Sequence, residues 1–169
     1  QDSSSAASDV YKRQSEGRLE VERCLQTIIF SAEEAKRLNS EIIPLDAAPG
    51  NSGKFGFTLR VPVGIVAAIS PFNFPLNLVA HKVGPALAAG NSVVLKPASD
   101  TPLSALKLTE IMIDSGFPPE SIQCITGSGS TIGNALVSNP KIRKVTFTGS
   151  QEVGEVTVSY THLRAHETS

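Results

Sequence analysis

The sequence predicts an α/β fold in which a doubly wound parallel sheet is covered by helices on both faces. Short runs of β-branched and small apolar residues alternate along the chain with longer segments of helical periodicity. The short runs show no polar alternation, which is typical of strands buried on both faces. Glycine, proline and helix-capping residues separate the elements. Strands that alternate with helices in this way form parallel sheets.

The first elements are a helix and a separate strand. A helix is predicted over 19–38, where apolar residues recur on one side. These residues are Val21, Leu25, Ile28 and Ile29. After a loop signal at 51–53, aromatic and apolar residues alternate with polar or small ones over 54–60. The alternating residues are Phe55, Phe57 and Leu59. We therefore expect a strand over 54–60 with one buried face.

The remaining elements alternate regularly. Buried strands are predicted over 63–70, 92–96, 121–125 and 143–147. The helix over 75–89 has Pro75 at its first position, Pro85 in its interior and Gly90 just past its end.

The next helix takes Asp100 or Thr101 as its cap and Pro102 in its first turn, and Gly116 and Pro118 stop it. A short helix over 131–137 precedes the last strand.

Composition excludes several classes of protein. The chain has 169 residues, which fits one domain or a piece of a larger protein, and 40% of them are hydrophobic, so it is not a disordered chain. A net charge of -1 leaves no basic excess for nucleic acid. The apolar stretch 61–69 is too short to span a membrane. Cys24 and Cys124 cannot form a disulfide framework and suggest a reducing compartment. We expect a cytoplasmic protein without nucleic-acid or membrane partners.

Both ends differ from the middle of the chain. Residues 1–14 are serine-rich without periodicity, and 159–169 hold His162 and His166 without an apolar pattern. Both ends can be disordered tails, but we favour the alternative that they are translated sequencing-adapter sequence. In that case the two histidines bind no metal, and 15–158 is the incomplete domain.

The segments that follow the predicted strands outline one crevice, since parallel sheets bind ligands beyond their carboxyl ends. Small, polar or turn-forming residues fill these segments, which are 70–75, 96–100, 127–133 and 148–150. The glycines of GSGSTIG do not match the usual dinucleotide fingerprint, and Lys96 stands where a standard Rossmann fold places an acidic ribose ligand. Tight turning and close packing explain Gly127, Gly129 and Gly133 equally well.

Taken in order, these segments resemble the aldehyde dehydrogenase family over about 19–156. The motifs are PVGIVAAISPFNFPLN, GPALAAGNSVVLKPAS, GSGSTIG and VTFTGSQEVG. The resemblance implies a Rossmann-like domain that binds NAD or NADP, in an enzyme that oxidises an aldehyde to a carboxylic acid through a cysteine thiohemiacetal. In that family the cysteine and the general-base glutamate lie downstream of the TGS turn. We therefore expect this chain alone to be inactive.

The resemblance also assigns roles to residues. Asn73 matches the asparagine that donates to the thiohemiacetal oxyanion, a task suited to an oriented neutral donor; the alternative is that it only turns the chain. Lys96 matches a lysine that hydrogen-bonds the adenosine ribose. Ser99 stands where NAD-selective relatives carry glutamate, so NADP should be tolerated or preferred. The other implied cofactor positions are Ile69, Ser70, Phe72, Gly129, Gly133, Phe147, Gly149, Ser150 and Val153.

Substrate and assembly are further implications. Phe74, Leu78 and His81 share one helical face and match the aldehyde entry tunnel, although core packing explains Leu78 equally well. His81 favours a small polar aldehyde such as lactaldehyde, a phosphorylated glyceraldehyde or a semialdehyde. Residues 54–60 resemble a bridging strand of family oligomers, so a homo-oligomer is expected. The alternatives are a non-catalytic nucleotide-binding module and an acylating, CoA-dependent relative.

Overall fold

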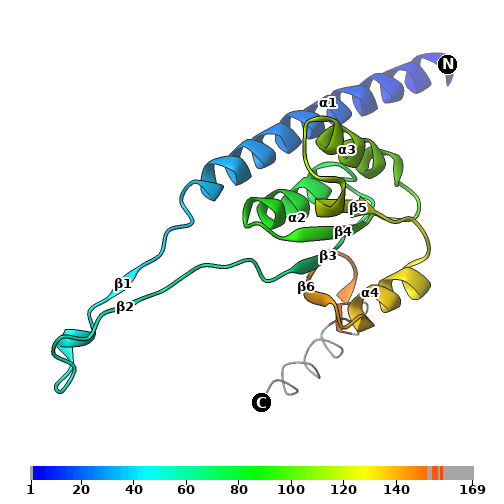
Figure 1. The fold of residues 1–169 in the computed structure, drawn as a ribbon. Coiled ribbons are helices and arrows are strands. Elements are labelled where there is room, and N and C mark those ends of the chain that lie inside the picture. Colours follow the sequence, from blue (N-terminus) through cyan, green and yellow to red (C-terminus); the bar gives the residue numbers. More distant parts are fainter. Residues whose placement is uncertain (1, 152–153, 156, 158–169) are drawn as a thin grey trace.

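A parallel sheet between helices forms the body of the protein (Figure 1). The computed structural model describes residues 2–151, 154, 155 and 157. In this part of the chain the sheet has four strands in the order β5-β4-β3-β6. They are β3 (Ile65–Ile69), β4 (Ser92–Lys96), β5 (Ile122–Cys124) and β6 (Ile142–Phe147). The predicted parallel α/β sheet is confirmed.

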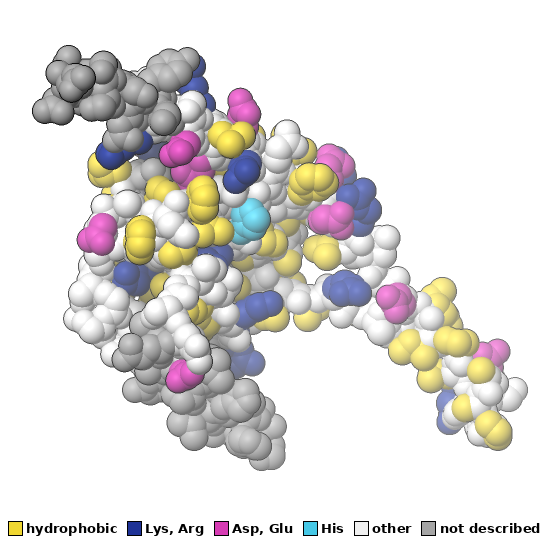
Figure 2. Space-filling model, turned by 180° about the vertical axis from the view of Figure 1, so that it is seen from behind, with side chains coloured by type: hydrophobic (Ala, Val, Ile, Leu, Met, Phe, Trp, Pro, Cys, Tyr) yellow, Lys and Arg dark blue, Asp and Glu magenta, His cyan; other side chains and the backbone are white. Residues whose placement is uncertain are grey.

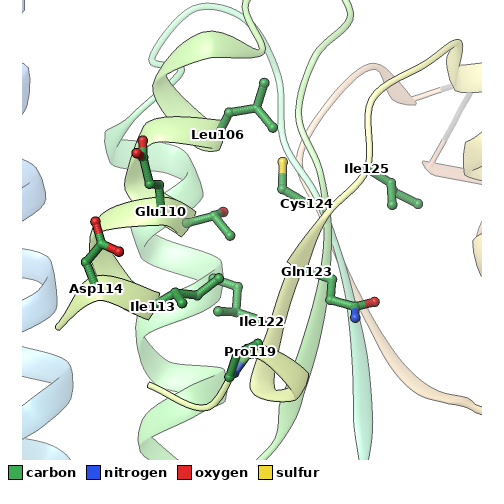
Figure 3. Close-up of a pocket in the computed structure, with 10 residues that line it drawn as sticks. Leu106, Glu110, Ile113, Asp114, Pro119, Ile122, Gln123, Cys124 and Ile125 are labelled. Atoms are coloured by element: carbon green, nitrogen blue, oxygen red, sulfur yellow. The ribbon is translucent and has the colours of Figure 1, made fainter. Parts of the chain in front are cut away.

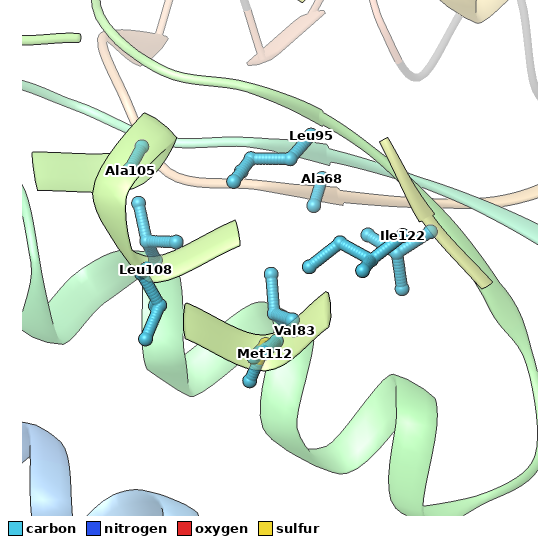
Figure 4. Close-up of a cluster of buried hydrophobic side chains, with 9 residues drawn as sticks. Ala68, Val83, Leu95, Ala105, Leu108, Met112 and Ile122 are labelled. Carbon is cyan, nitrogen blue, oxygen red and sulfur yellow. The ribbon is translucent and has the colours of Figure 1, made fainter. Parts of the chain in front are cut away.

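Helices cover both faces of this sheet. α2 (Asn77–Ala88) and α3 (Leu103–Asp114) lie on one face, and α4 (Asn134–Ser138) lies on the other with the preceding π-helical turn η3 (Gly129–Gly133). Successive strand residues point to opposite faces, so Ala68 belongs to the core under α2 and α3, and Ala67 to the core under α4. Figure 4 shows the first core, in which Val83 and Leu108 meet Leu95 of the sheet.

α1 (Asp2–Ala35) runs across α2, and it differs from the prediction in length. Residues 2–14, which show no periodicity in the sequence, continue the helix towards its N-terminus. Adding residues to an existing helix needs no new nucleus, and alanine, lysine, arginine and glutamine are good helix formers. His162 and His166 lie outside the described residues, and the tail boundaries at 14 and 159 stay predictions.

Of the four residues on the predicted apolar side of α1, only Ile28 faces the body, where it packs against the core under α2 and α3. Val21, Leu25 and Ile29 are exposed, whereas Cys24 is buried and its neighbours on that side are half-buried. Those neighbours are Glu20, Thr27, Ile28 and Ser31. The reason is the close approach of the helices at Gly84, where a Cβ would lie 2.6 Å from Ser31 Oγ. So close a crossing requires a small side chain, and Ser31 supplies one on this side of α1.

A two-stranded arm projects from the body (Figures 1 and 2). It holds β1 (Ile42–Ile43), the 3₁₀ turn η1 (Leu45–Ala47) and β2 (Gly56–Phe57), which pairs antiparallel with β1. The prediction of a buried strand face over 54–60 was wrong. Phe55 and Leu59 are 72% and 68% exposed. The alternation of residues over 54–60 correctly indicates that one side of the segment is apolar, but no described part of the chain covers that side.

Turn residues set the ends of the elements. Gly90 follows α2 at φ +76° and Gly116 follows α3 at φ +102°, as predicted, since glycine adopts positive φ readily. The predicted cap of α3 was wrong: the cap position is Pro102, and no side chain bonds there. The 3₁₀ turn η2 (Pro119–Ser121) leads into β5. No helix among the described residues is long and apolar enough to cross a membrane.

Candidate cofactor site

The strand order reverses beside β3. The chain builds β4 and β5 on one side of β3 and then crosses to place β6 on the other side. Parallel α/β sheets bind ligands at the carboxyl edge beside such a reversal. The register there aligns Ile69 with both Lys96 and Phe147. Three residues assigned to the cofactor from separate motifs therefore form one row across the sheet.

Two buried groups mark the carboxyl edge. Ser70 is 5% exposed, and its Oγ has no hydrogen-bond partner among the described residues. Buried hydroxyls are normally bonded, so this one is suited to a polar ligand group. Lys96 is 4% exposed, and its Nζ donates to Pro97 O at 3.0 Å. Burial lowers the pKa of Lys96 because water no longer stabilises the ammonium.

The loops after β4 and β5 are joined by a side chain. Ser99 Oγ donates to Gly127 O at 3.0 Å. Ser128, which follows Gly127, caps η3: its Oγ accepts a hydrogen bond from Thr131 N at 3.2 Å. Ser99 is itself exposed. This bond places the residue expected to govern NAD or NADP choice against the glycine turn.

The glycines at this edge fall into two groups. Gly127 has φ +149°, and a Cβ there would collide with Ile132. A Cβ on Gly149 would lie 2.5 Å from Phe147 Cζ. A Cβ on either glycine would therefore displace a side chain of the chain itself, and Gly127 also has a positive φ, which supports the packing explanation for Gly127.

Gly129 and Gly133 are different. A Cβ on either would meet nothing within 4 Å, and neither has a positive φ. Neither turning nor packing among the described residues explains them. They leave bare backbone in η3 and just before α4, where no described side chain prevents the close approach of a ligand. The residues present thus fit a dinucleotide, and Lys96, Ser99, Gly129 and Gly133 would hold it.

Asn73 lies in the turn between β3 and α2, with its side chain exposed beside the exposed Phe72. On the β6 side, Gly149 and Ser150 are exposed, and Ser150 O accepts from Gly154 N at 3.1 Å. Both turns start from the carboxyl edge. Val153 lies outside the described residues.

The proposed substrate residues lie elsewhere: Phe74 is in the turn before α2, and Leu78 and His81 are on α2. Phe74 and His81 are exposed and Leu78 is half-buried. His81 borders a cavity of about 420 Å³ between α1 and α2, and another of about 160 Å³ between α2 and β6. The predicted common helical face is therefore limited to Leu78 and His81, because Phe74 precedes α2, and none of the three residues belongs to the row at the carboxyl edge.

Lys82 was missed by the sequence analysis. It is 6% exposed, and its Nζ donates to Thr148 Oγ1 at 2.5 Å, so it links α2 to the turn after β6. Burial lowers the pKa of Lys82. A signal was available, because Lys82 falls within the buried stripe of α2 that Val79 and Val83 define.

Figure 3 shows a cavity of about 580 Å³ between α3 and the edge strand β5. Leu106, Glu110 and Cys124 are among its lining residues, but no assigned site residue is. Burial raises the pKa of Cys124, and burial with the nearby Glu20 raises that of Cys24. A raised pKa keeps a thiol protonated, so neither cysteine is activated as a nucleophile.

Comparison with known proteins identifies similar chains. The family model described as "Aldehyde dehydrogenase family" matches residues 4–165. The chain is 54% identical to a 3-sulfolactaldehyde dehydrogenase of Priestia aryabhattai over 94% of its length and 33% of that protein. It is 48% identical to aspartate-semialdehyde dehydrogenase 1 of Pseudomonas canavaninivorans, over 80% of its length and 29% of that protein.

A solved structure is also similar. The chain matches the NADP-dependent glyceraldehyde-3-phosphate dehydrogenase from Bacillus halodurans C-125 complexed with NADP, with a TM-score of 0.80 and 46% identity. That match covers 83% of this chain and 30% of that chain. This chain thus spans about a third of the length of the relatives it matches.

Proposed function

The chain belongs to the aldehyde dehydrogenase family, and we propose that it forms the NAD(P)-binding part of an enzyme that oxidises an aldehyde to a carboxylic acid. The bare backbone at Gly129 and Gly133 carries this proposal, because a ligand that approaches closely explains two glycines that the chain's own packing does not. The aligned carboxyl ends of β3, β4 and β6 support it.

Different residues are proposed to bind different parts of the dinucleotide. The Lys96 ammonium and the Ser99 hydroxyl would hold the ribose, and the exposed turn at Gly149 and Ser150 would hold the pyrophosphate. The buried Ser70 hydroxyl, which has no partner among the described residues, would bind a polar group on the nicotinamide side. A dinucleotide held by these residues would supply the hydride acceptor for the oxidation.

Asn73 acts on the substrate. Its side-chain amide donates a hydrogen bond to the oxyanion of a thiohemiacetal formed by a cysteine. An oriented neutral donor of this kind is typically worth about 3 kcal/mol in the transition state. In the proposed enzyme that cysteine and the general-base glutamate lie outside this chain, so the chain alone does not turn over.

A small anionic or polar aldehyde is the proposed substrate. The relatives named above act, by their names, on 3-sulfolactaldehyde, aspartate semialdehyde and glyceraldehyde 3-phosphate. His81 offers a polar group on α2, whereas Leu78 on the same helix and Phe74 before it are apolar. The homo-oligomer, the absence of nucleic-acid partners and the cytoplasmic location stay predictions. A non-catalytic nucleotide-binding module and an acylating relative stay the alternatives.

We propose that the site accepts NADP as well as NAD. An acidic side chain at position 99 would repel a 2′-phosphate, whereas serine does not. We expect the chain to bind both dinucleotides in calorimetric titration. Lys96→Met should weaken both, and Ser99→Glu should weaken NADP by about tenfold or more relative to NAD, since 1.4 kcal/mol of charge repulsion is a factor of ten.

Lys54→Met on the projecting arm is the matched control, and it should bind as the unaltered chain does. No binding of either dinucleotide, or a strong preference for NAD in the unaltered chain, would contradict the proposal. An unchanged NADP-to-NAD ratio in Ser99→Glu would contradict the role of position 99.

A further inference from the structure

α2 begins without a cap from its own segment. Its cap position is Leu76, whose side chain cannot accept a hydrogen bond, and Pro75 precedes it. The first N–H groups of a helix have no partner within the helix, so they need an acceptor from elsewhere. This matters for the site because α2 directly follows the turn that carries Asn73.

A carboxylate from α1 supplies the missing acceptor. Glu20 Oε1 accepts from Leu76 N at 2.8 Å and from Asn77 N at 2.9 Å. The two donors are 56 and 57 residues away in sequence, so this is a tertiary contact. Glu20 is half-buried there, and bonds from N–H groups to a carboxylate are stronger than those to a neutral acceptor.

Further contacts fix α1 at this position along α2. Thr27 Oγ1 donates to Asn77 Oδ1 at 3.2 Å. One helical turn on, Ser31 lies against Gly84, where the absence of a Cβ lets the helices approach closely. Glu20 is therefore held in register with the start of α2 by the helix crossing itself.

We propose that Glu20 is a positioning residue for Asn73. By accepting from the first amides of α2, it fixes the start of that helix and holds the turn from 70 to 76 in one conformation. The inference rests on the proposed function, because the oxyanion role of Asn73 is what makes the geometry of this turn important. A donor that is free to move loses stabilising power, since electrostatic stabilisation depends on preorganisation.

The test compares three variants of the chain by NMR. Glu20→Ala removes the acceptor, Glu20→Gln keeps an uncharged one, and Glu22→Ala changes an exposed residue of the same helix as a control. In Glu20→Ala, hydrogen exchange of the Leu76 and Asn77 amides should be at least about tenfold faster, because two bonds to a charged group are lost. The order parameter of the Asn73 side-chain amide should fall.

Glu20→Gln should restore most of the protection, with exchange at the two amides about threefold faster than in the unaltered chain. Glu22→Ala should change neither readout. These measurements need no dinucleotide or aldehyde. A chain that fails to bind the cofactor would therefore contradict the proposed function without changing the result for Glu20.

Two outcomes would overturn the inference. One is that exchange at Leu76 and Asn77 and the mobility of Asn73 are unchanged in Glu20→Ala. The other is that all core amides lose protection equally, which would make Glu20 a general stabiliser of the fold. If the alanine variant does not fold, Glu20→Gln decides: unchanged exchange at these two amides would overturn the proposal.

Discussion

The substitution Gly133→Ala tests whether position 133 is glycine because a ligand approaches the backbone there or because the packing of the chain requires it. Gly133 has φ −59° and ψ −49°, which is ordinary helical backbone, and a Cβ there would meet nothing within 4 Å. In such a place alanine loses less conformational entropy on folding than glycine does. The free energy of unfolding should therefore rise by about 0.4–1 kcal/mol.

Dinucleotide affinity should change in the opposite direction. If the bare backbone receives the cofactor, the added methyl group lies in the space that the ligand needs. Overpacking by one such group typically costs about 1–3 kcal/mol, so the Kd for NADP should rise roughly tenfold. Gly129→Ala should likewise weaken binding without loss of stability, because its Cβ also meets open space.

Urea unfolding followed by circular dichroism gives the stability, and calorimetric titration with NADP gives the affinity. Gly127→Ala is the matched control: φ +149° and the contact with Ile132 should make it less stable, by about 1–3 kcal/mol for the backbone alone. The reasoning is refuted if Gly133→Ala lowers the free energy of unfolding and leaves the Kd for NADP unchanged.

Two other substitutions test the carboxyl edge. Gly149→Ala should lower the free energy of unfolding by about 1–3 kcal/mol in urea, because its Cβ would press on the Phe147 ring; unchanged stability would contradict that packing. For Lys82, burial places the folded-state pKa below the ordinary 10.5, so the unfolded chain binds more protons between the two values. The stability of the unaltered chain should therefore rise with pH towards 10.5, by at most about 1.4 kcal/mol per pH unit relative to Lys82→Met. Parallel pH profiles of the two proteins would count against this.

Much of the fold could be predicted because burial on both faces imposes a pattern on each strand separately. The strand at 92–96 has the predicted bounds, and Gly90 ends α2 as expected. The errors share a physical cause. Val21, Leu25 and Phe55 are apolar and periodic, but periodicity shows only that a side is apolar; which side is covered depends on what packs against it.

The sequence by itself determined the strands, their order along the chain and the residues that follow each strand, since these depend on local composition and on the rules for parallel sheets. The tertiary structure decided which of those residues meet. Only the register brings Ile69, Lys96 and Phe147 into one row. Only helix packing sets Glu20 at the start of α2, because a hydrogen bond across 56 residues leaves no periodic trace in the sequence.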